Sequence, residues 1–340
     1  MTKYSLKNKT ILITGGTGSL GKAIVKTLIE NKIEFKKIII FSRDELKQSV
    51  MQNSLNKKII NKFRFFIGDI RDKDRLKRAV VDTDIVIHAA ALKQIPTAEY
   101  NPFECIKTNI FGSQNLIEAC LDAKVEKVIA LSTDKASSPI NLYGATKLCS
   151  DKLFIAANNI KGKRKIIFNV VRYGNVLGSR GSVIPYFIEL NNKNKILSVT
   201  DAKMTRFNIL ISEGVDLILK SLESNLGGQV FIPKIPSYRI LDLVKAINAK
   251  AKIKIIGIRS GEKLHEEMIS SSDSYRTIQF KSYYSILPFS DKNIITNYIK
   301  KNKAKPVETN FNYSSDTNAH FLSVAELTKM IDHYINENTN

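Results

Sequence analysis

The sequence predicts an α/β protein built on a doubly wound parallel sheet, with a smaller C-terminal lobe. Three observations carry this prediction. Short β-branched runs alternate with helical periodicity through the first half of the chain. A glycine-rich turn separates the first of these runs from the first helix. The length of 340 residues and the apolar content of 43% are sufficient for a large buried core.

Buried strands are expected where β-branched and aromatic residues run together, because a parallel strand covered on both faces has no polar side. The intervening stretches place apolar residues four apart, as at Leu20, Ile24 and Leu28, which is typical of a helix packed on one face. Alternating strands and helices build βαβ units and hence a Rossmann-type sheet. The expected strands are Ile11–Ile13, Ile38–Phe41, Phe63–Ile67, Ile85–His88, Val128–Leu131 and Ile166–Val171.

The regular alternation weakens after about residue 172, where Gly and Pro cluster. We therefore expect a main Rossmann domain over residues 1–174, to which a segment at about 207–235 returns. Residues 175–206 and 236–340 are expected to form the smaller, substrate-binding lobe and the C-terminal elements. A last helix is predicted to begin at Ser323, whose hydroxyl can cap it while Glu326 reaches back.

The charge balance is strongly basic, because 53 Lys and Arg against 32 Asp and Glu give a formal charge of +21. Such a balance is typical of proteins that bind phosphate backbones. However, Lys greatly outnumbers Arg, whereas proteins that read bases and phosphates favour the Arg fork. We therefore expect a solvated, lysine-rich surface and no nucleic-acid partner.

Cysteine usage and hydropathy indicate the cellular compartment in which the protein is expected. The three cysteines are widely spaced and odd in number, which excludes a disulfide scaffold and indicates a reducing cytoplasm. No apolar run approaches the ~20 residues that cross a bilayer, so no membrane association is expected. No metal site is predicted.

The first motif that carries chemistry is the turn after the first strand, where Gly15, Gly18 and Gly21 form a GxxGxxG pattern. Glycine allows a sharp turn and lets a pyrophosphate approach the N-terminus of the next helix, where free N–H groups and the helix dipole favour anions. The pattern could also be a turn with close helix packing. Its position between a strand and a helix favours a dinucleotide site.

The residues after the second strand indicate which dinucleotide is bound. An NAD site usually has a carboxylate there for the ribose 2′-hydroxyl. In this chain Ser42 and Arg43 come first, and Lys47 follows one helical turn later. Hydroxyl, guanidinium and ammonium groups suit a 2′-phosphate and favour NADP. The alternative is a solvated loop in which Asp44 serves NAD.

Two further strand ends contribute polar groups. Asp69 could accept a hydrogen bond from the adenine amino group, or could instead cap the next helix. His88 is interpreted as a packed histidine and not as a catalyst. The small residues that follow it allow the backbone to run close to a cofactor.

The fifth strand ends in Ser-Thr, and Tyr143 and Lys147 follow at i and i+4. On a helix these two side chains share a face. A lysine ammonium one turn from a phenol stabilises the phenolate and can hold a nicotinamide ribose. The phenolate can then take a proton from a hydroxyl as a hydride leaves the same carbon.

Together these motifs resemble the extended short-chain dehydrogenase/reductases over nearly the whole chain. One branch of that family is especially similar: the soluble inverting UDP-N-acetylglucosamine 4,6-dehydratases, which open pseudaminic acid biosynthesis. The residues that carry this closer resemblance are Asp134-Lys135, the run from Asn141 to Lys147, the run from Arg172 to Val176, Met204 to Phe207, and Gly257 to Glu266.

The resemblance implies a redox-neutral reaction at a sugar. Hydride leaves carbon 4, water is lost across carbons 5 and 6, and the hydride returns to carbon 6 with inversion at carbon 5. The product would be a UDP-2-acetamido-2,6-dideoxy-L-arabino-hexos-4-ulose, and the enzyme a hydro-lyase. Tyr143 would take the first proton, supported by Lys147 and Thr133.

Elimination needs a base for carbon 5 and an acid for the departing hydroxyl. The resemblance implies that Lys135 is the base and Asp134 the acid. Lys135 must then be neutral, and we expect burial and the nearby cations Lys93 and Lys147 to lower its pKa. Asp134 must be protonated, which requires desolvation. The alternative is an Asp–Lys pair at the surface.

The resemblance also assigns binding residues and assembly. For NADP it implies Gly15, Thr17, Gly18, Ser19, Leu20, Gly21, Ser42, Arg43, Lys47, Asp69, Ile70, Ala90, Lys93, Tyr143, Lys147 and Val176. For UDP-N-acetylglucosamine it implies Lys93, Asn175, Arg180, Gly181, Ser182, Val183, Thr200, Arg259 and Glu262. Arg206 could equally be a structural ion-pair residue. A homo-oligomer, specifically a hexamer, is expected by resemblance alone.

Four other functions stay open at the level of sequence. A UDP-sugar 4-epimerase or a retaining 4,6-dehydratase would use a similar site. Retaining relatives with Thr-Asp-Lys carry Met where this chain has Tyr143, which argues against them. A non-catalytic NADP sensor, or a basic nucleic-acid binder on the same scaffold, is less compatible with the intact Tyr143, Lys147 and Asp134-Lys135 set.

Overall fold

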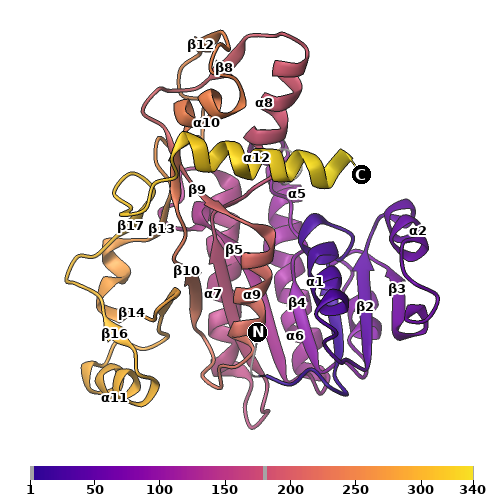
Figure 1. Cartoon of the computed structure of the whole chain (residues 1–340). Helices are drawn as coiled ribbons and strands as arrows, with labels where there is room; N and C mark the ends of the chain where they lie inside the picture. The colour runs from indigo at the N-terminus through magenta and orange to yellow at the C-terminus, as the bar shows by residue number, and fades with distance from the viewer. Residues whose placement is uncertain (1–3, 179–181, 340) are drawn as a thin grey trace.

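A computed structural model describes residues 4–178 and 182–339 of the chain. A ten-stranded sheet forms its centre, with helices on both faces (Figure 1). Seven neighbouring strands are parallel, in the order β3-β2-β1-β4-β5-β6-β10. This is the Rossmann strand order, in which the chain crosses over between β3 and β4. The doubly wound parallel sheet predicted from the sequence is therefore confirmed.

The observed parallel strands lie where β-branched residues run together. The expected bounds of β3 and β4 are those observed, and β1, β2 and β5 extend one or two residues beyond the expected bounds at each end. Strand β6 begins one residue and ends two residues later than expected, and β10 was not predicted as a strand. The strands are β1 (Thr10–Thr14), β2 (Lys37–Ser42), β3 (Phe63–Ile67), β4 (Ile85–His88), β5 (Lys127–Thr133), β6 (Ile167–Tyr173) and β10 (Val230–Pro233).

Strand alternation divides the core between the two faces of the sheet. Ile11 and Ile13 of β1 pack in one hydrophobic cluster and Leu12 packs in the other. Helices α1 and α9 cover the first face and contact each other, whereas α3, α6 and α7 cover the second. These helices are α1 (Ser19–Glu30), α3 (Lys73–Ala79), α6 (Gly112–Asp122), α7 (Leu142–Ile160) and α9 (Ile211–Ser221).

Shorter elements complete the first half of the chain. Helix α2 (Glu45–Asn53) follows β2, and a 3-10 turn, η1 (Ile60–Lys62), precedes β3. After β4 the chain forms α4 (Ile95–Tyr100), α5 (Pro102–Ile106) and a π-helical turn, η2 (Lys107–Phe111), that leads into α6. A 3-10 turn, η3 (Asp134–Ala136), follows β5.

The C-terminal part of the chain also contributes to the central sheet. Strands β15 (Tyr283–Ile286), β14 (Thr277–Gln279) and β16 (Lys305–Pro306) continue it beyond β10 as an antiparallel edge. A 3-10 turn, η4 (Ser271–Arg276), precedes β14, and α11 (Lys292–Asn302) lies between β15 and β16. Three strands of the segment 236–340, which we expected to hold part of the smaller lobe and the C-terminal elements, thus extend the main sheet.

The remaining elements form a smaller lobe above the carboxyl ends of the parallel strands (Figure 1). It contains the three-stranded sheet β11-β9-β7, the pair β8-β12 and the pair β13-β17. Its strands are β7 (Asn175–Val176), β8 (Leu197–Val199), β9 (Thr205–Ile209), β11 (Ser237–Arg239), β12 (Ile253–Ile255), β13 (Glu267–Ile269) and β17 (Tyr313–Ser314).

Three helices close this lobe: α8 (Val183–Asn192), α10 (Ile240–Ile247) and α12 (Val324–Thr339). Phe187, Leu243, Leu327 and Ile331 share one buried cluster, in which α10 contacts both α8 and the last helix. Its start is the predicted capping box: the Glu326 N–H donates to Ser323 Oγ, and the Ser323 N–H donates to Glu326 Oε2.

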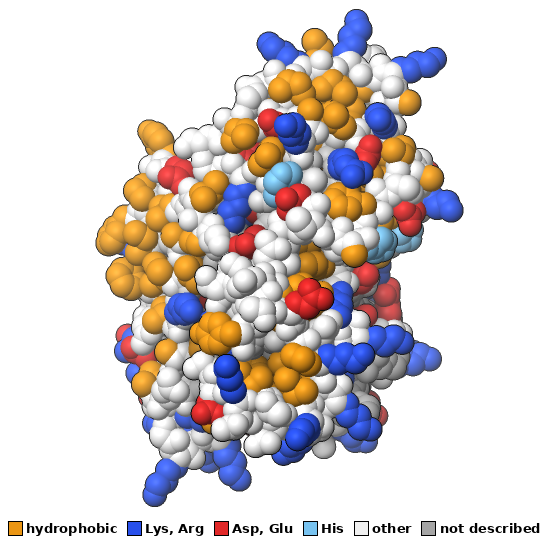
Figure 2. Space-filling view, turned by 90° about the vertical axis from the view of Figure 1, so that its left-hand side faces the viewer, with side chains coloured by type: hydrophobic (Ala, Val, Ile, Leu, Met, Phe, Trp, Pro, Cys, Tyr) orange, Lys and Arg blue, Asp and Glu red, His pale blue; other side chains and the backbone are white. Residues whose placement is uncertain are grey.

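The surface seen in Figure 2 carries Lys and Arg side chains scattered among acidic and uncharged ones. Hydrophobic side chains gather at the top of this view, where β8 and β12 lie. Among residues 4–178 and 182–339, no helix is long and apolar enough to span a membrane.

Candidate active site

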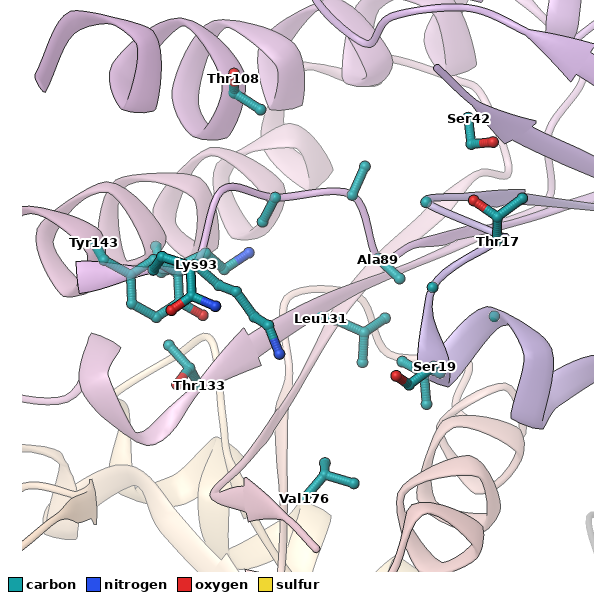
Figure 3. A pocket seen from close by; sticks show the side chains of 18 of the residues that line it. Thr17, Ser19, Ser42, Ala89, Lys93, Thr108, Leu131, Thr133, Tyr143 and Val176 are labelled. Atoms are coloured by element: carbon teal, nitrogen blue, oxygen red, sulfur yellow. The ribbon is translucent and has the colours of Figure 1, made fainter. Parts of the chain in front are cut away.

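A cavity of about 970 Å³ runs along the carboxyl ends of β1, β2, β4 and β5. In Figure 3 its labelled residues spread between two ends: Thr17, Ser19 and Ser42 on one side, Lys93, Thr133 and Tyr143 on the other. We call these the β2 end and the η3 end. All sixteen residues predicted to bind the cofactor line the cavity. Ligands of open α/β sheets bind at this edge, where the strand order reverses.

The glycine turn leaves room for a ligand at the start of α1. Gly15 has φ +66°, and a β-carbon there would lie 2.9 Å from the backbone nitrogen of Ala90. A β-carbon at Gly21 would lie 2.3 Å from the carbonyl oxygen of Gly16, so only glycine allows α1 to pack this closely on the turn. The cradle therefore fits a pyrophosphate at the helix N-terminus.

At the β2 end, the predicted 2′-phosphate residues surround a small polar site. Ser42 is buried, and its hydroxyl accepts a hydrogen bond from Gln48 Nε2. The guanidinium of Arg43 is half-exposed and lies 3.6 Å from Asp69 Oδ2. Asp44 caps α2 by accepting from the backbone N–H of Lys47 and also pairs with the Lys47 ammonium. The Asp44 carboxylate is therefore occupied within its own helix turn.

Asp69 does not cap the next helix, which was the structural alternative to a role in adenine binding. The cap of α3 is Asp72, which accepts from the Arg75 N–H. Asp69 instead accepts from the backbone N–H and the guanidinium of Arg71. Burial alone would raise the pKa of Asp69, but the hydrogen bonds from Arg71 lower it below its ordinary value. Asp69 is thus an anion facing the cavity.

His88 is packed, as interpreted from the sequence. Its Nδ1 lies 2.8 Å from Thr14 Oγ1 and its Nε2 lies 3.4 Å from Ser113 Oγ. Burial, with a smaller contribution from the Lys147 cation, lowers its pKa to about 3. The ring is therefore neutral, and it joins β1 and β4 to helix α6.

The η3 end is built by two elements that meet backbone to backbone. Strand β5 ends at Thr133, and η3 then carries Asp134 and Lys135. Helix α7 begins after Asn141, whose side chain caps it by accepting from the Gly144 N–H. Tyr143 and Lys147 lie on the first turns of α7, and both line the cavity with Thr133 and Lys135.

Lys135 does not have the lowered pKa that we expected. Its Nζ lies 3.0 Å from Asp134 Oδ1 and 3.0 Å from Glu266 Oε1, with Asn175 Oδ1 at 3.4 Å. Burial alone would lower the pKa of Lys135, and the Arg206 cation acts the same way, but the two carboxylates outweigh both and raise it. Between these two carboxylates Lys135 is thus an ammonium ion.

The pKa of Asp134 is shifted in the direction expected for an acid. Its side chain is fully buried, and its Oδ1 accepts from Thr133 Oγ1 at 2.9 Å as well as from Lys135. Its Oδ2 is buried with no hydrogen-bond partner among the described residues. Burial raises the pKa of Asp134, and Glu266 adds to that rise, while Lys135 opposes it.

The cation that most lowers the pKa of Tyr143 is Lys135, and not Lys147 as predicted. Burial raises the pKa of its phenol to about 12. The main opposing influence is Lys135, followed by a hydrogen bond with Thr133. Lys147, one turn along the helix, is itself deeply buried, and its pKa is lowered by that burial against the pull of Asp151.

The residues predicted for the sugar nucleotide divide into three groups. Lys93, Asn175 and Ser182 line the cavity. Arg180 and Gly181 lie outside the described residues. Val183, Thr200, Arg259 and Glu262 are not among the lining residues; Arg259 is exposed, and Glu262 lies 3.5 Å from Arg206.

Two charged residues beside the site were not among the predicted site residues, although Arg206 was considered as a structural ion-pair residue. Arg206 is buried and reaches Glu262 and Glu266, so its ion-pair role is observed. Glu266 was quoted only as the end of the Gly257-to-Glu266 run. That motif was the sequence signal that could have pointed to Glu266 as a site residue. The fold is needed to show that Glu266 lies beside Lys135.

The strand order and the glycine turn define an extended short-chain dehydrogenase/reductase within the Rossmann class. The chain belongs to the family described as polysaccharide biosynthesis protein, whose model matches residues 11–288. A UDP-N-acetylglucosamine 4,6-dehydratase (inverting) from Campylobacter jejuni is 55% identical over 330 residues, covering 96% of this chain and 98% of the relative.

Two other relatives broaden the comparison. A UDP-glucose 4-epimerase from Rickettsia bellii is 46% identical over 285 residues, covering 82% of this chain and 83% of the relative. The crystal structure of Pen from Bacillus thuringiensis is 35% identical with a TM-score of 0.87, covering 97% of this chain and all of that one.

Proposed function

We propose that this protein is an NADP-dependent UDP-N-acetylglucosamine 4,6-dehydratase that inverts carbon 5. The observation that carries the proposal is the 55% identity to the Campylobacter jejuni dehydratase over 96% of this chain. The site supports it, since a lysine and a carboxylic acid meet at the η3 end of a cavity that also contains Tyr143 and Lys147. The product would be a UDP-2-acetamido-2,6-dideoxy-L-arabino-hexos-4-ulose.

Cofactor binding would use the glycine cradle and the β2 end. The turn before α1 would hold the pyrophosphate, and Lys147 would hold the nicotinamide ribose. Ser42, Arg43 and Lys47 would contact the 2′-phosphate of NADP. The preference for NADP is supported by two cations in the cavity wall at this end and by the internal engagement of Asp44.

The residues of the η3 end divide the proton transfers between them. Bound nicotinamide would accept a hydride from carbon 4 of the sugar and return it to carbon 6. Tyr143 would take the proton of the 4-hydroxyl. Lys135 would remove the carbon 5 proton, and Asp134 would protonate the leaving 6-hydroxyl.

The base and acid forms of this pair are one proton transfer away from the Lys135–Asp134 ion pair. Moving a proton from Lys135 Nζ to Asp134 Oδ1, across 3.0 Å, breaks an N–H bond and forms an O–H bond. The result is a neutral amine beside a protonated carboxyl group. Total charge is unchanged, which suits a buried site.

The product of UDP-N-acetylglucosamine turnover in deuterated water tests the proposal. Inverting dehydration places deuterium at carbon 5 and leaves a reduced carbon 6, both visible by NMR. A 4-epimerase, which the Rickettsia bellii relative makes the second candidate, would return a 6-hydroxylated sugar without deuterium at carbon 5. A retaining dehydratase would give the opposite carbon 5 configuration, and a sensor would give no product.

Three finer points belong to the same proposal. The sugar product would enter pseudaminic acid biosynthesis, and the protein would act in the cytoplasm as a homo-oligomer, specifically a hexamer. Free Cys105, Cys120 and Cys149 support a reducing compartment. Sedimentation of the purified protein measures the assembly directly.

A further inference from the structure

Glu266 is held firmly against the η3 end by its backbone. Its N–H donates to Ser315 Oγ at 2.9 Å, and its carbonyl oxygen accepts from the Ser315 N–H at 2.8 Å. The next residue begins β13, which pairs with β17. Glu266 is 2% exposed, so this strand pair delivers a carboxylate into the protein interior.

The side chain of Glu266 is placed between two cations. Its Oε1 lies 3.0 Å from Lys135 Nζ and 3.8 Å from Arg206 Nε. Its Oε2 is buried without a hydrogen-bond partner among the described residues. A buried carboxylate stays ionised only where such cations offset its desolvation, so Glu266 depends electrostatically on Lys135 as much as Lys135 depends on Glu266.

Lys135 therefore has two carboxylates at equal distance, of which only Asp134 belongs to the proposed elimination. The surroundings of Glu266 and Lys135 contain other titratable and charged groups from separate elements. These are Arg206 on β9, Tyr143 on α7, Tyr238 on β11, Lys93 after β4, and Glu262 and Lys263 before β13.

We propose that Glu266 is a positioning residue for the Lys135–Asp134 pair. It holds Lys135 Nζ against Asp134, and its negative charge sets the pH range in which the pair shares a single proton. The catalytic consequence rests on the proposed function; the coupling to Lys135 does not. Because one anion strengthens proton binding at both Lys135 and Asp134, removing it should move both ionisations of the pair to lower pH.

The first test measures the Lys135 amine directly. Folded protein is treated with trace acetic anhydride at pH 9, and acetylation of Lys135 is compared with that of exposed Lys152 by mass spectrometry of peptides. Only the neutral amine reacts. A drop of about one pKa unit in Glu266→Gln would raise relative labelling about tenfold. Glu267→Gln is the matched control, since that carboxylate accepts from Ser137 and Ser138. Unchanged labelling in Glu266→Gln would overturn the inference.

The second test is the pH profile of kcat/KM for UDP-N-acetylglucosamine. Both limbs should shift to lower pH in Glu266→Gln, whereas Glu266→Asp, which keeps the charge, should leave them near those of the unaltered protein. A lower rate with unshifted limbs would show a merely structural role. If the unaltered protein turns over no UDP-sugar, the proposed function is refuted. The labelling result then still decides whether Glu266 is coupled to Lys135.

A double variant covers the case in which Glu266→Gln does not fold. Lys135→Met combined with Glu266→Gln, both made in an Asp134→Asn background so that no buried carboxylate loses its cation, removes both charges and should recover stability relative to Glu266→Gln in the same background. If the double variant is no more stable, Glu266 supports the fold through Arg206 and not through Lys135, and the inference is wrong.

Discussion

A β-carbon at Gly144 would lie 2.2 Å from the carbonyl oxygen of Lys135, so helix α7 and η3 touch backbone to backbone. Through this contact the residue that would take the first proton, Tyr143, is placed beside the pair that would carry out the elimination. Glycine is required here because of the close approach and not because of its dihedral angles.

Gly144→Ala is therefore expected to separate α7 from η3. Overpacking of this kind costs about 1–3 kcal/mol of unfolding free energy, which urea denaturation would measure. Turnover should fall further than stability alone explains. Gly214→Ala in α9 is the control, because its nearest neighbour is an ordinary contact at 3.8 Å; it should be neutral or stabilise by about 0.5–1 kcal/mol. Equal effects of the two variants would contradict the argument.

Lys135→Ala should abolish dehydration while the cofactor still binds. Loss of the base is expected to lower kcat by about 10²–10⁴-fold, whereas the glycine cradle and the β2 end are untouched. Turnover assays and fluorescence titration with the dinucleotide would measure the two effects. Lys152→Ala, at an exposed position of α7, should change neither, and full activity of Lys135→Ala would refute the mechanism.

Arg43→Ala should weaken NADP binding far more than NAD binding. A charge-assisted hydrogen bond to the 2′-phosphate contributes about 1.5–3 kcal/mol, or roughly 10–100-fold in Kd. Calorimetric titration with both dinucleotides gives the comparison, with Arg64→Ala, at an exposed position of β3, as the control. An equal loss of affinity for both dinucleotides would instead indicate that Arg43 acts by pairing with Asp69.

His88 should make the fold sensitive to acid. Its pKa is about 3 when folded, below the ordinary 6.5 of an exposed histidine. Since the unfolded chain binds the proton more tightly, the stabilising contribution is complete above pH 6.5 and falls by about 1.4 kcal/mol for each pH unit below it, until about pH 3. Denaturation curves at pH 7.5, 6.5 and 5.5 would show this slope.

The same experiment on His88→Asn isolates the contribution. Below pH 6.5 that variant should lose stability less steeply, although it is weaker overall because Thr14 and Ser113 lose their ring partner. His320→Gln, at an exposed position, should keep the original slope. An NMR titration in which His88 protonates near pH 6.5 in the folded protein would show that its burial has no such effect.

Local patterns were sufficient for most of the fold. The β-branched runs predicted the bounds of β3 and β4 and the positions of four further parallel strands, because a buried parallel strand must be apolar on both faces. The capping pair Ser323 and Glu326 predicted the start of α12 for a similarly local reason. The antiparallel edge β15-β14-β16 was not predicted, since its short strands are defined by their partners and not by their own periodicity.

The sequence by itself determined the glycine cradle, the β2 end and the shared face of Tyr143 and Lys147, because each is a spacing within a single strand–turn–helix unit. Only the tertiary structure decided the charge on Lys135. Burial and neighbouring cations argued for a neutral amine, yet Glu266, the residue just before β13, lies beside Lys135 and, with Asp134, keeps the amine protonated. A pKa depends on every charge within a few ångströms, and the fold alone determines which distant residues those are.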